Sequence, residues 1–233
     1  MRIVILQPSY LPWLGAFDQL RRADLFVLYD DVQYDKNGWR NRNRIKTAAG
    51  PNWLTVPVLT SGKSGQTIRD TRIDPHHKWA EKHQQALRTH YARAPHFESV
   101  FALLEPMLSP AWRWLGELDE ALFRLLAGAM RIDRRVVRSG DLRIGGGQSE
   151  RLVNICRRFG ATDYLSGAAA RDYLDVAQFE AAGIRVEFQA YAHPIYPQLH
   201  GAFLPYLSIV DLMMNVGPIA AAEWLTRGVE VQA

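Results

Sequence analysis

The sequence contains one cysteine, Cys156, among its 233 residues. A single cysteine excludes an internal disulfide and any metal site built from several cysteines. Cys156 shares a helical spacing with Leu152, Ile155 and Phe159. That spacing indicates a place in the core rather than a nucleophile.

Long apolar runs are also absent. No apolar stretch reaches eighteen residues, so no membrane-spanning helix and no membrane partner are expected. The opening run meets Gln7 and Pro8 too early to act as the core of a secretory signal, so we expect a cytoplasmic protein. Hydrophobic residues make up 48% of the chain and charged residues 22%, which excludes disorder and predicts a sizeable core.

Lysine is scarce, with 5 lysines beside 23 arginines, and the net charge is +4. Arginine recognises carboxylate and phosphate groups in a bidentate manner, so we expect an anionic small-molecule ligand. No block of five or six like charges occurs, and the basic segments near Arg40 and Arg134 are interrupted. Nucleic acid is therefore not an expected partner.

Familiar cofactor and catalytic motifs are missing too. The segment 61–65 contains Gly-Lys-Ser, but Pro57 replaces the glycine that a phosphate loop needs, and no convincing helix follows. No dinucleotide fingerprint and no nucleophile elbow occur. Three histidines recur every seven residues, too far apart for helical metal ligands, and indicate a half-solvated helix face: His76, His83 and His90. No metal site is predicted and the cofactor stays unassigned.

The chain opens with a predicted β-α-β unit made of a strand over 2–6, a helix over 13–22 and a strand over 25–29. The connection is long enough for a crossover, so the two strands should be parallel. Ligands of open α/β sheets bind at the carboxyl ends of the strands. The turn over 7–13 and the segment after Tyr29 are therefore expected on one rim.

The remaining pattern predicts a hairpin over 42–47 and 53–58, strands over 67–73, 135–138, 163–165 and 184–188, and helices over 77–91, 96–104, 111–130, 149–159, 176–182, 206–215 and 218–227. The predicted fold class is α/β, a mostly parallel three-layer sheet opening with the β-α-β unit, plus the β-hairpin and a helical middle segment. We expect a single domain over 1–233 with a helical insertion at about 77–130, and a two-domain division is the alternative. The triple glycine at 145–147 fits either a connector or a phosphate cradle.

Two stretches near the N-terminus combine polar, aromatic and small residues at predicted strand ends. The first is Gln7-Pro8-Ser9-Tyr10-Leu11-Pro12-Trp13-Leu14-Gly15, in which two prolines fix the turn and the polar side chains supply hydrogen-bonding groups. The second begins with Asp30-Asp31-Val32-Gln33-Tyr34 and continues through Lys36-Asn37-Gly38-Trp39-Arg40-Asn41-Arg42-Asn43-Arg44-Ile45-Lys46. Such a mixture suits a phosphorylated or sugar-bearing ligand, and a solvated hairpin is the alternative.

Two later stretches have a similar character. Tyr164-Leu165-Ser166-Gly167 leads through small residues into Arg171-Asp172-Tyr173-Leu174, where a helix is predicted to open. Small residues let backbone amides approach a ligand. The other stretch combines 191–198 with Leu207-Ser208-Ile209-Val210-Asp211-Leu212, where Ser208, Asp211 and Asn215 share one helical stripe. The wet face of a helix is the alternative explanation of that stripe.

Taken together, these four stretches resemble the WbqC-like family, a bacterial group from gene clusters for O-antigen and other surface polysaccharides. The resemblance spans almost the whole chain and implies transfer of glycine to an amino sugar during O-antigen assembly. A non-catalytic protein that binds a nucleotide sugar or a pathway partner is the alternative. A weaker likeness to nucleotidylyltransferase-like folds lacks their His-x-Gly-His motif between Tyr10 and Phe17, so no motif supports the use of ATP.

Aminoacyl transfer needs a base, a site for the developing oxyanion and a grip on the anionic ligand. We expect Asp30, Asp31 or His193 to supply the base, and Gln7 with the Ser166-Gly167 amides to line the oxyanion site. The expected partners are an anionic small molecule, a nucleotide sugar, and a carrier-linked amino acid as donor. The expected substrate-binding residues are Gln7, Tyr10, Trp13, Gly15, Tyr34, Arg40, Asn41, Arg42, Asn43, Arg44, Lys46, Ser166, Gly167, Arg171, Asp172, Tyr173, Ser208 and Asp211.

Overall fold

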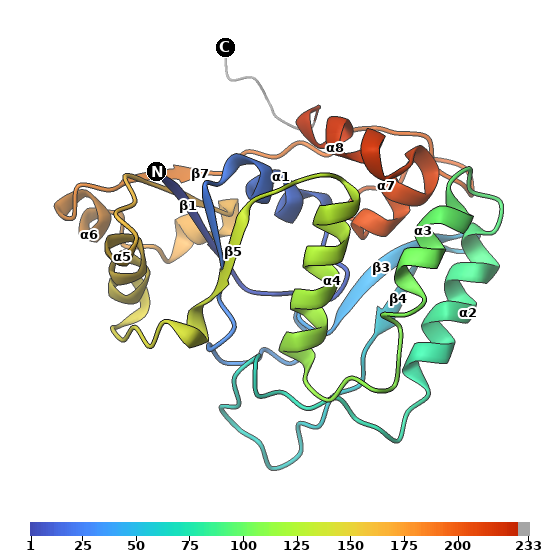
Figure 1. The fold of residues 1–233 in the computed structure, drawn as a ribbon, viewed down its shortest axis with the longest axis horizontal. Coiled ribbons are helices and arrows are strands. Elements are labelled where there is room, and N and C mark those ends of the chain that lie inside the picture. The colour runs from blue at the N-terminus through green and yellow to red at the C-terminus, as the bar shows by residue number, and fades with distance from the viewer. Residues whose placement is uncertain (228–233) are drawn as a thin grey trace.

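Five short parallel strands form the central sheet in a computed structural model that describes residues 1–227 (Figure 1). The sheet order is β5-β2-β1-β6-β7, and every pairing in it is parallel. The chain builds outward from β1 in one direction and then, starting at β6, in the other, as in doubly wound sheets. The strands are β1 (Arg2–Leu6), β2 (Leu25–Leu28), β5 (Arg135–Arg138), β6 (Asp163–Ser166) and β7 (Arg185–Phe188).

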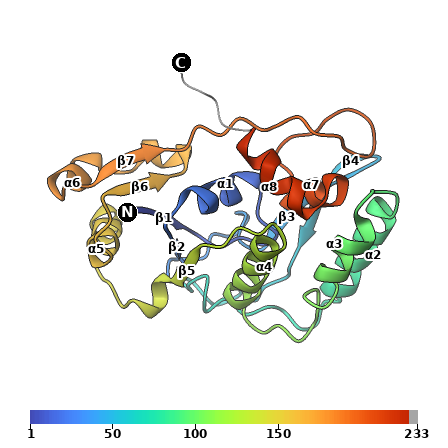
Figure 2. The same ribbon diagram turned by 45° about the horizontal axis from the view of Figure 1, so that its top comes forward.

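Helices cover both faces of the sheet, because successive strand side chains point to opposite sides. Ile3 and Ile5 pack toward α5 (Gln148–Arg158) and α6 (Val176–Ala181), whereas Val4 packs toward the opposite face. That face is covered by α1 (Leu14–Arg22), α4 (Leu115–Ala129), α7 (Ile209–Val216) and α8 (Pro218–Thr226) (Figures 1 and 2). The predicted three-layer α/β fold with a mostly parallel sheet is therefore confirmed.

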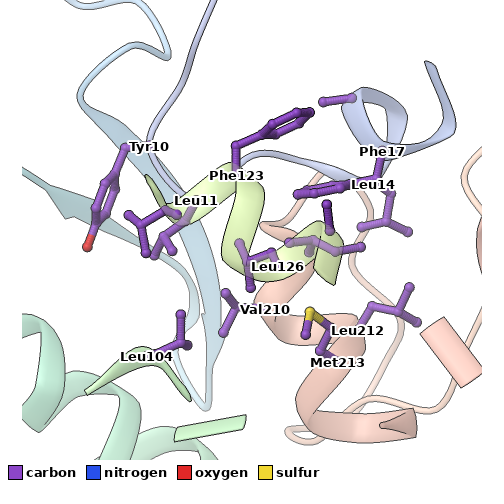
Figure 3. Packing of buried hydrophobic residues seen from close by; sticks show 14 of the residues in the cluster. Tyr10, Leu11, Leu14, Phe17, Leu104, Phe123, Leu126, Val210, Leu212 and Met213 are labelled. Carbon is purple, nitrogen blue, oxygen red and sulfur yellow. The ribbon is translucent and has the colours of Figure 1, made fainter. Parts of the chain in front are cut away.

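The larger of the two cores joins the beginning, middle and end of the chain. Phe123 of α4 stacks on Phe17 of α1, with ring centroids 5.1 Å apart, and lies 4.9 Å from Phe26 of β2. Figure 3 shows Phe17 and Leu14 near Phe123, with Val210 and further α7 side chains on the other side of the cluster. Helix α1 therefore reaches its buried state only when α4 and the C-terminal helices are in place.

The smaller core contains the single cysteine. Cys156 of α5 is buried between α5 and the sheet, and burial raises its pKa to about 12. A thiol with such a pKa is protonated at neutral pH and is a poor nucleophile. The structural role predicted for Cys156 is confirmed.

A two-stranded hairpin and a helical segment lie between β2 and β5 in the chain. The hairpin pairs β3 (Arg42–Thr47) with β4 (Gly50–Thr55), so its second strand begins three residues earlier than the predicted 53. Helices α2 (Trp79–Tyr91) and α3 (Phe97–Leu104) lie side by side at the outer end of the molecule (Figures 1 and 2). His83 is buried on α2, so the half-solvated face predicted for the spaced histidines is wrong at that position.

The strand predicted over 67–73 is wrong. Only isolated bridges occur there, such as Gln33 with Thr67 and Val58 with Ile73. Ile68 and Ile73 are buried, which explains the strand-like pattern. The backbone groups of the segment bond instead to several different parts of the chain, so no continuous ladder can form.

A second local difference concerns the segment after β6. A short 3₁₀ helix spans Ala168–Asp172, and α6 starts only at Val176. Arg171 and Asp172 therefore end a helical turn rather than open a helix. None of the helices within residues 1–227 combines the length and the apolar character needed to cross a bilayer.

Candidate functional site

Two adjoining cavities lie at the carboxyl ends of β1, β2 and β6, beside the point where the strand order reverses. The larger, here called the polar cavity, has a volume of about 640 Å³ and is lined by residues that include Tyr29, Gly147, Arg151, Ser166 and Tyr173. The smaller, here called the aromatic pocket, has a volume of about 320 Å³ and is lined by residues that include Ser9, Trp13, Trp39, Asn43 and Tyr206. Leu6, Gln7 and Arg40 line both. Ligand sites of doubly wound sheets occur at this position.

An ion pair stands at the wall of the polar cavity. Arg151 of α5 pairs with the carboxylate of Asp31, which also accepts a hydrogen bond from Ser139 Oγ. The guanidinium carbon of Arg151 lies 5.1 Å from the ring centroid of Tyr29, and its Nε donates to the Ile144 carbonyl. Arg151 is thus fixed by three contacts, and it presents a cation to the cavity.

The neighbouring acid, Asp30, faces the protein interior. It is buried and accepts hydrogen bonds from Arg138 Nε at 2.7 Å and from the Gly140 amide at 2.9 Å. These bonds join the end of β2 to the end of β5. Neither Asp30 nor Asp31 is among the residues that line the two cavities, and Asp31 is linked to the polar cavity through its partner Arg151.

Gly146 and Gly147, the last two of the three consecutive glycines, line the polar cavity and lead into α5. Gly146 has φ +130°, and a Cβ there would lie 2.9 Å from the Arg151 nitrogen, so a larger residue would be strained. The Gly147 amide donates to the Glu150 carboxylate, and α5 begins at the next residue. The partial positive charge of a helix N-terminus favours an anion in the adjoining space.

The segment after β6 forms the opposite wall. Ser166 is buried at the strand end and lies with Gly167 against the cavity, and Tyr173 stands at its mouth with 58% of its surface exposed. Arg171 and Asp172, in contrast, are exposed and do not line either cavity. The structure thus brings three of these five predicted binding residues to the cavity.

The aromatic pocket is framed by three large rings from distant parts of the chain. Trp13 and Tyr206 have centroids 6.2 Å apart, and Trp39 completes the wall. Trp39 and Tyr206 leave 41% and 54% of their surface exposed. Within the part of the chain that the structure describes, no hydrogen bond engages the side chains of Gln7 and Ser9 at this pocket.

Arg40 stands at the junction of the two cavities. Its Nη1 donates to the carbonyls of Gln7 and Pro8, each at 3.1 Å, and its Nε lies 3.4 Å from Asp35. Burial lowers the pKa of Arg40, while Asp35 and Asp119 oppose that change. Asp119 is fully buried, and no hydrogen bond within residues 1–227 reaches its carboxylate, so burial raises its pKa well above the usual range.

Most polar residues of the hairpin stretch bind the protein's own backbone. Asn41 Nδ2 donates to the Val56 carbonyl, and Asn43 Nδ2 to the Leu11 carbonyl, each at 2.7 Å. The other basic side chains of β3 do the same: Arg42 donates to the Gly38 and Asn37 carbonyls, Arg44 to that of Tyr206, and Lys46 to those of Gly201 and Ala202. Among the predicted binding residues of this stretch, only Arg40 and Asn43 line the two cavities.

Four further predicted residues are buried and line neither cavity: Tyr10, Tyr34, Ser208 and Asp211. Tyr10 is fully buried with its hydroxyl 2.8 Å from His83 Nδ1, and Tyr34 is buried. Ser208 caps α7 by accepting from the Val210 amide. Asp211 is buried and accepts from the Tyr91, Tyr196 and Gln198 side chains. None of the four contributes to the surface of the aromatic pocket.

His193 lies beside the aromatic pocket. Its ring centroid is 5.3 Å from that of Tyr206 and 6.3 Å from that of Trp13. Both ring nitrogens lack a hydrogen-bond partner within residues 1–227, and burial lowers the pKa of His193 to about 4. The imidazole is therefore neutral at neutral pH.

Several lining residues were not among the predicted site residues: Ser9, Tyr29, Trp39, Gly146, Gly147, Arg151 and Tyr206. The glycine run before a predicted helix was a usable signal for the segment 146–151. Nothing local marks Tyr206, because its part in the pocket depends on contacts with residues more than 160 positions earlier in the chain. No cluster of three or more His, Cys, Asp or Glu side chains in the described residues is placed to hold a metal ion.

Comparison with known proteins finds a similarity that covers most of the residues that line the two cavities. A model of the WbqC-like protein family matches residues 7–223, a range that includes all four stretches described above. The chain is similar to the uncharacterized protein Rv1507c of Mycobacterium tuberculosis (strain ATCC 25618 / H37Rv), with 41% identity over 218 residues, which is 93% of this chain and 94% of that protein. No solved structure matches the chain.

Proposed function

The chain belongs to the WbqC-like protein family, and from that premise we propose that it is a transferase that moves glycine from an activated donor to the amino group of a nucleotide-linked sugar. The observation that supports this most is the junction at Gln7 and Arg40, where a polar cavity and an aromatic pocket meet. A nucleotide sugar has a ring at each end and an anionic diphosphate between them. The base would occupy the aromatic pocket, the sugar would occupy the polar cavity, and the diphosphate would lie at Arg40 between them. The pathway implied by the family is assembly of a surface polysaccharide.

The reaction forms a bond between the sugar nitrogen and the glycyl carbonyl carbon and breaks the bond between that carbon and the donor's carrier. The nitrogen must lose a proton, and the carbonyl oxygen must be stabilised as negative charge develops. Asp31, the ion-pair partner of the cavity-lining Arg151, would accept the proton. The backbone amides of the Ser166-Gly167 segment would stabilise the oxygen.

The anionic part of the ligand would use the cations and dipoles at the same rim. Arg40 lies between the cavities, and Arg151 with the N-terminus of α5 lies across the polar cavity. Arginine and a helix N-terminus each favour phosphate oxygens. The ligand that we propose is therefore a small anion rather than a nucleic acid.

One observation favours a second candidate function, binding of a nucleotide sugar without catalysis. The Asp31 carboxylate is already bound by Arg151 and Ser139, and Asp30 by Arg138 and Gly140. A carboxylate whose oxygens already accept hydrogen bonds has fewer free positions for a substrate proton. A binding protein would keep these pairs intact, whereas a transferase would have to free Asp31 when the substrate binds.

The two functions are separated by a product assay. The protein would be incubated with UDP-linked amino sugars and a glycyl thioester or glycyl adenylate, and the sugar analysed by mass spectrometry for an added glycyl group. We expect Asp31→Asn to lower kcat by about a hundredfold or more, the range of general-base catalysis, with KM little changed. Asp133→Asn, an exposed acid before β5, is the matched control. Saturable nucleotide-sugar binding without product for any donor would refute the transferase and support the binding function.

A further inference from the structure

The aromatic pocket offers exposed ring faces at a concave surface. Trp39 and Tyr206 keep about half of their surface free, and Trp13 lies behind Tyr206. Aromatic rings exposed in a pocket provide stacking surfaces for a planar ligand group. The volume of about 320 Å³ lies at the lower end of the range of roughly 300–1,000 Å³ typical of small-molecule sites, so the pocket suits a single ring system with its attached sugar.

The rings are held in place before any ligand arrives. Trp39 packs on Trp53 of β4 with centroids 5.1 Å apart, and the guanidinium carbon of Arg44 lies 5.4 Å from the Trp39 centroid. Arg44 Nη2 also donates to the Tyr206 carbonyl at 3.0 Å. One side chain therefore positions two walls, and little conformational entropy remains to be lost on binding.

Two polar side chains at the pocket have free hydrogen-bonding capacity. Gln7 carries an amide that can donate and accept, and Ser9 carries a hydroxyl that can do both. No hydrogen bond from residues 1–227 occupies either group, whereas the Asn43 amide is already bound to Leu11 and Arg44. Donors and acceptors beside a stacking surface are the groups that hydrogen-bond to the edge of a heterocyclic base.

The distribution of charge indicates how a nucleotide sugar would be oriented across the two cavities. Arg40 is the one charged residue among those lining the aromatic pocket, and it also lines the polar cavity. Sugar hydroxyls need polar partners, which the polar cavity supplies through Gln148, Arg151 and Ser166. A base in the aromatic pocket would place the attached phosphates at Arg40. The amino sugar that accepts the glycyl group would then lie in the polar cavity.

From these contacts we infer that the aromatic pocket is a nucleobase subsite, with Trp13, Trp39 and Tyr206 as stacking residues and Gln7 and Ser9 as the groups that recognise the base edge. The inference rests on the proposed function only in taking the ligand to be a nucleotide sugar. It assigns specificity for the nucleotide part to the turn after β1 and leaves the chemistry to the polar cavity.

The test compares two tryptophans of equal exposure. Trp39 lines the pocket and is 41% exposed, whereas Trp53 is 40% exposed, packs against Trp39 with its ring tilted, and does not line the pocket. Calorimetric titration would use UDP, CDP, dTDP and GDP, with inorganic pyrophosphate as a probe that has no base. We expect Trp39→Ala to weaken the best-bound nucleotide by about tenfold, as the loss of one stacking contact implies. Trp53→Ala should weaken it by less than about threefold, which is smaller than the loss of a stacking contact, and pyrophosphate affinity should stay unchanged in both.

A second variant tests recognition of the base edge. It also keeps the inference testable if Trp39→Ala does not fold. Gln7→Leu, checked by circular dichroism, should reduce the difference in affinity among the four nucleotides. Nucleotide binding that is insensitive to Trp39→Ala, or absent for all four nucleotides, would overturn the inference. Nucleotide binding that depends on Trp39 without any glycyl transfer would preserve the subsite and refute the transferase. Glycyl transfer together with a nucleotide Kd that Trp39→Ala does not change would support the transferase and refute the nucleobase subsite.

Discussion

The indole of Trp13 occupies the space that a side chain at Gly15 would need. A Cβ at position 15 would lie 2.7 Å from Cε2 of Trp13 and closer still to two further atoms of the ring. The ring that Gly15 accommodates is the one that forms the back wall of the aromatic pocket. The glycine of the Trp-Leu-Gly motif therefore sets the position of a pocket residue two places earlier.

Gly15→Ala should displace the Trp13 ring and narrow the aromatic pocket. Overpacking of this kind costs about 1–3 kcal/mol in the free energy of unfolding. We expect a lower urea midpoint together with weaker nucleotide binding. The matched control is Gly128→Ala in α4, where an added Cβ meets no atom within 4 Å. That variant should be stabilised by about 0.5–1 kcal/mol with unchanged binding, because alanine is the better helix former. Unchanged binding in Gly15→Ala would contradict the role given to Trp13.

Lys46→Met should loosen the segment that carries Tyr206. The buried Lys46 ammonium donates to the Gly201 carbonyl at 3.2 Å and to the Ala202 carbonyl at 2.5 Å. Methionine keeps the apolar stem but leaves both carbonyls without this donor, at a cost of about 1–3 kcal/mol. The measurement is the urea midpoint alongside nucleotide affinity, with the exposed Lys82→Met as the control expected to match the native protein. Equal stability of the two variants would show that the two bonds contribute little.

The buried His83 should make the protein less stable in mild acid. Burial lowers its pKa to about 4, against an ordinary value near 6.5, so the unfolded chain binds the proton more readily than the folded one. The stability that neutral His83 supplies is present above about pH 6.5 and is lost as the pH falls toward 4, by roughly 3 kcal/mol in total. Unfolding free energies of the native protein and His83→Gln, measured between these values, should show a shallower decline in the variant. Parallel curves would exclude His83 as the source.

Asp119 should change the free energy of unfolding with pH in the opposite direction to His83. Burial raises its pKa well above the usual range, so the folded state holds the proton and the native protein loses stability as the pH rises above the ordinary aspartate value near 3.9. Asn has the same shape and no charge to lose. Asp119→Asn should therefore gain stability relative to the native protein between about pH 5 and pH 8, where the unfolded aspartate is ionised. A difference that does not change with pH would mean that Asp119 is ionised in the fold, paired with Arg40.

The central sheet was predictable because its strands are short apolar runs that stop at turn residues. The bounds of β5 agree with the predicted 135–138, and β1 with the predicted 2–6, since both follow directly from local pattern. The segment 67–73 has a similar pattern, yet its amides bond to separate loops. Whether an extended segment joins a sheet depends on what lies beside it, and a single sequence does not carry that information.

For the site, the sequence predicted its location at the carboxyl ends of the strands but not which polar side chains face the cavities. Gln7, Arg40 and Ser166 were expected at strand ends and do line the cavities. Asn41 and Lys46 have the same chemistry in sequence, but Asn41 binds the Val56 carbonyl and Lys46 binds the carbonyls of Gly201 and Ala202. Polar residues that satisfy the backbone and polar residues that face a cavity look alike until the fold places them.

The wall that Tyr206 contributes has a consequence for synthesis on the ribosome. The turn after β1 is among the first parts of the chain to emerge, but the ring opposite it is made about two hundred residues later. Helix α1 likewise waits for α7 and α8 to cover its apolar side. N-terminal segments that cannot complete their packing during translation expose apolar surface. The nascent protein should therefore keep apolar surface exposed, and its aromatic pocket incomplete, until α7 and α8 have left the exit tunnel.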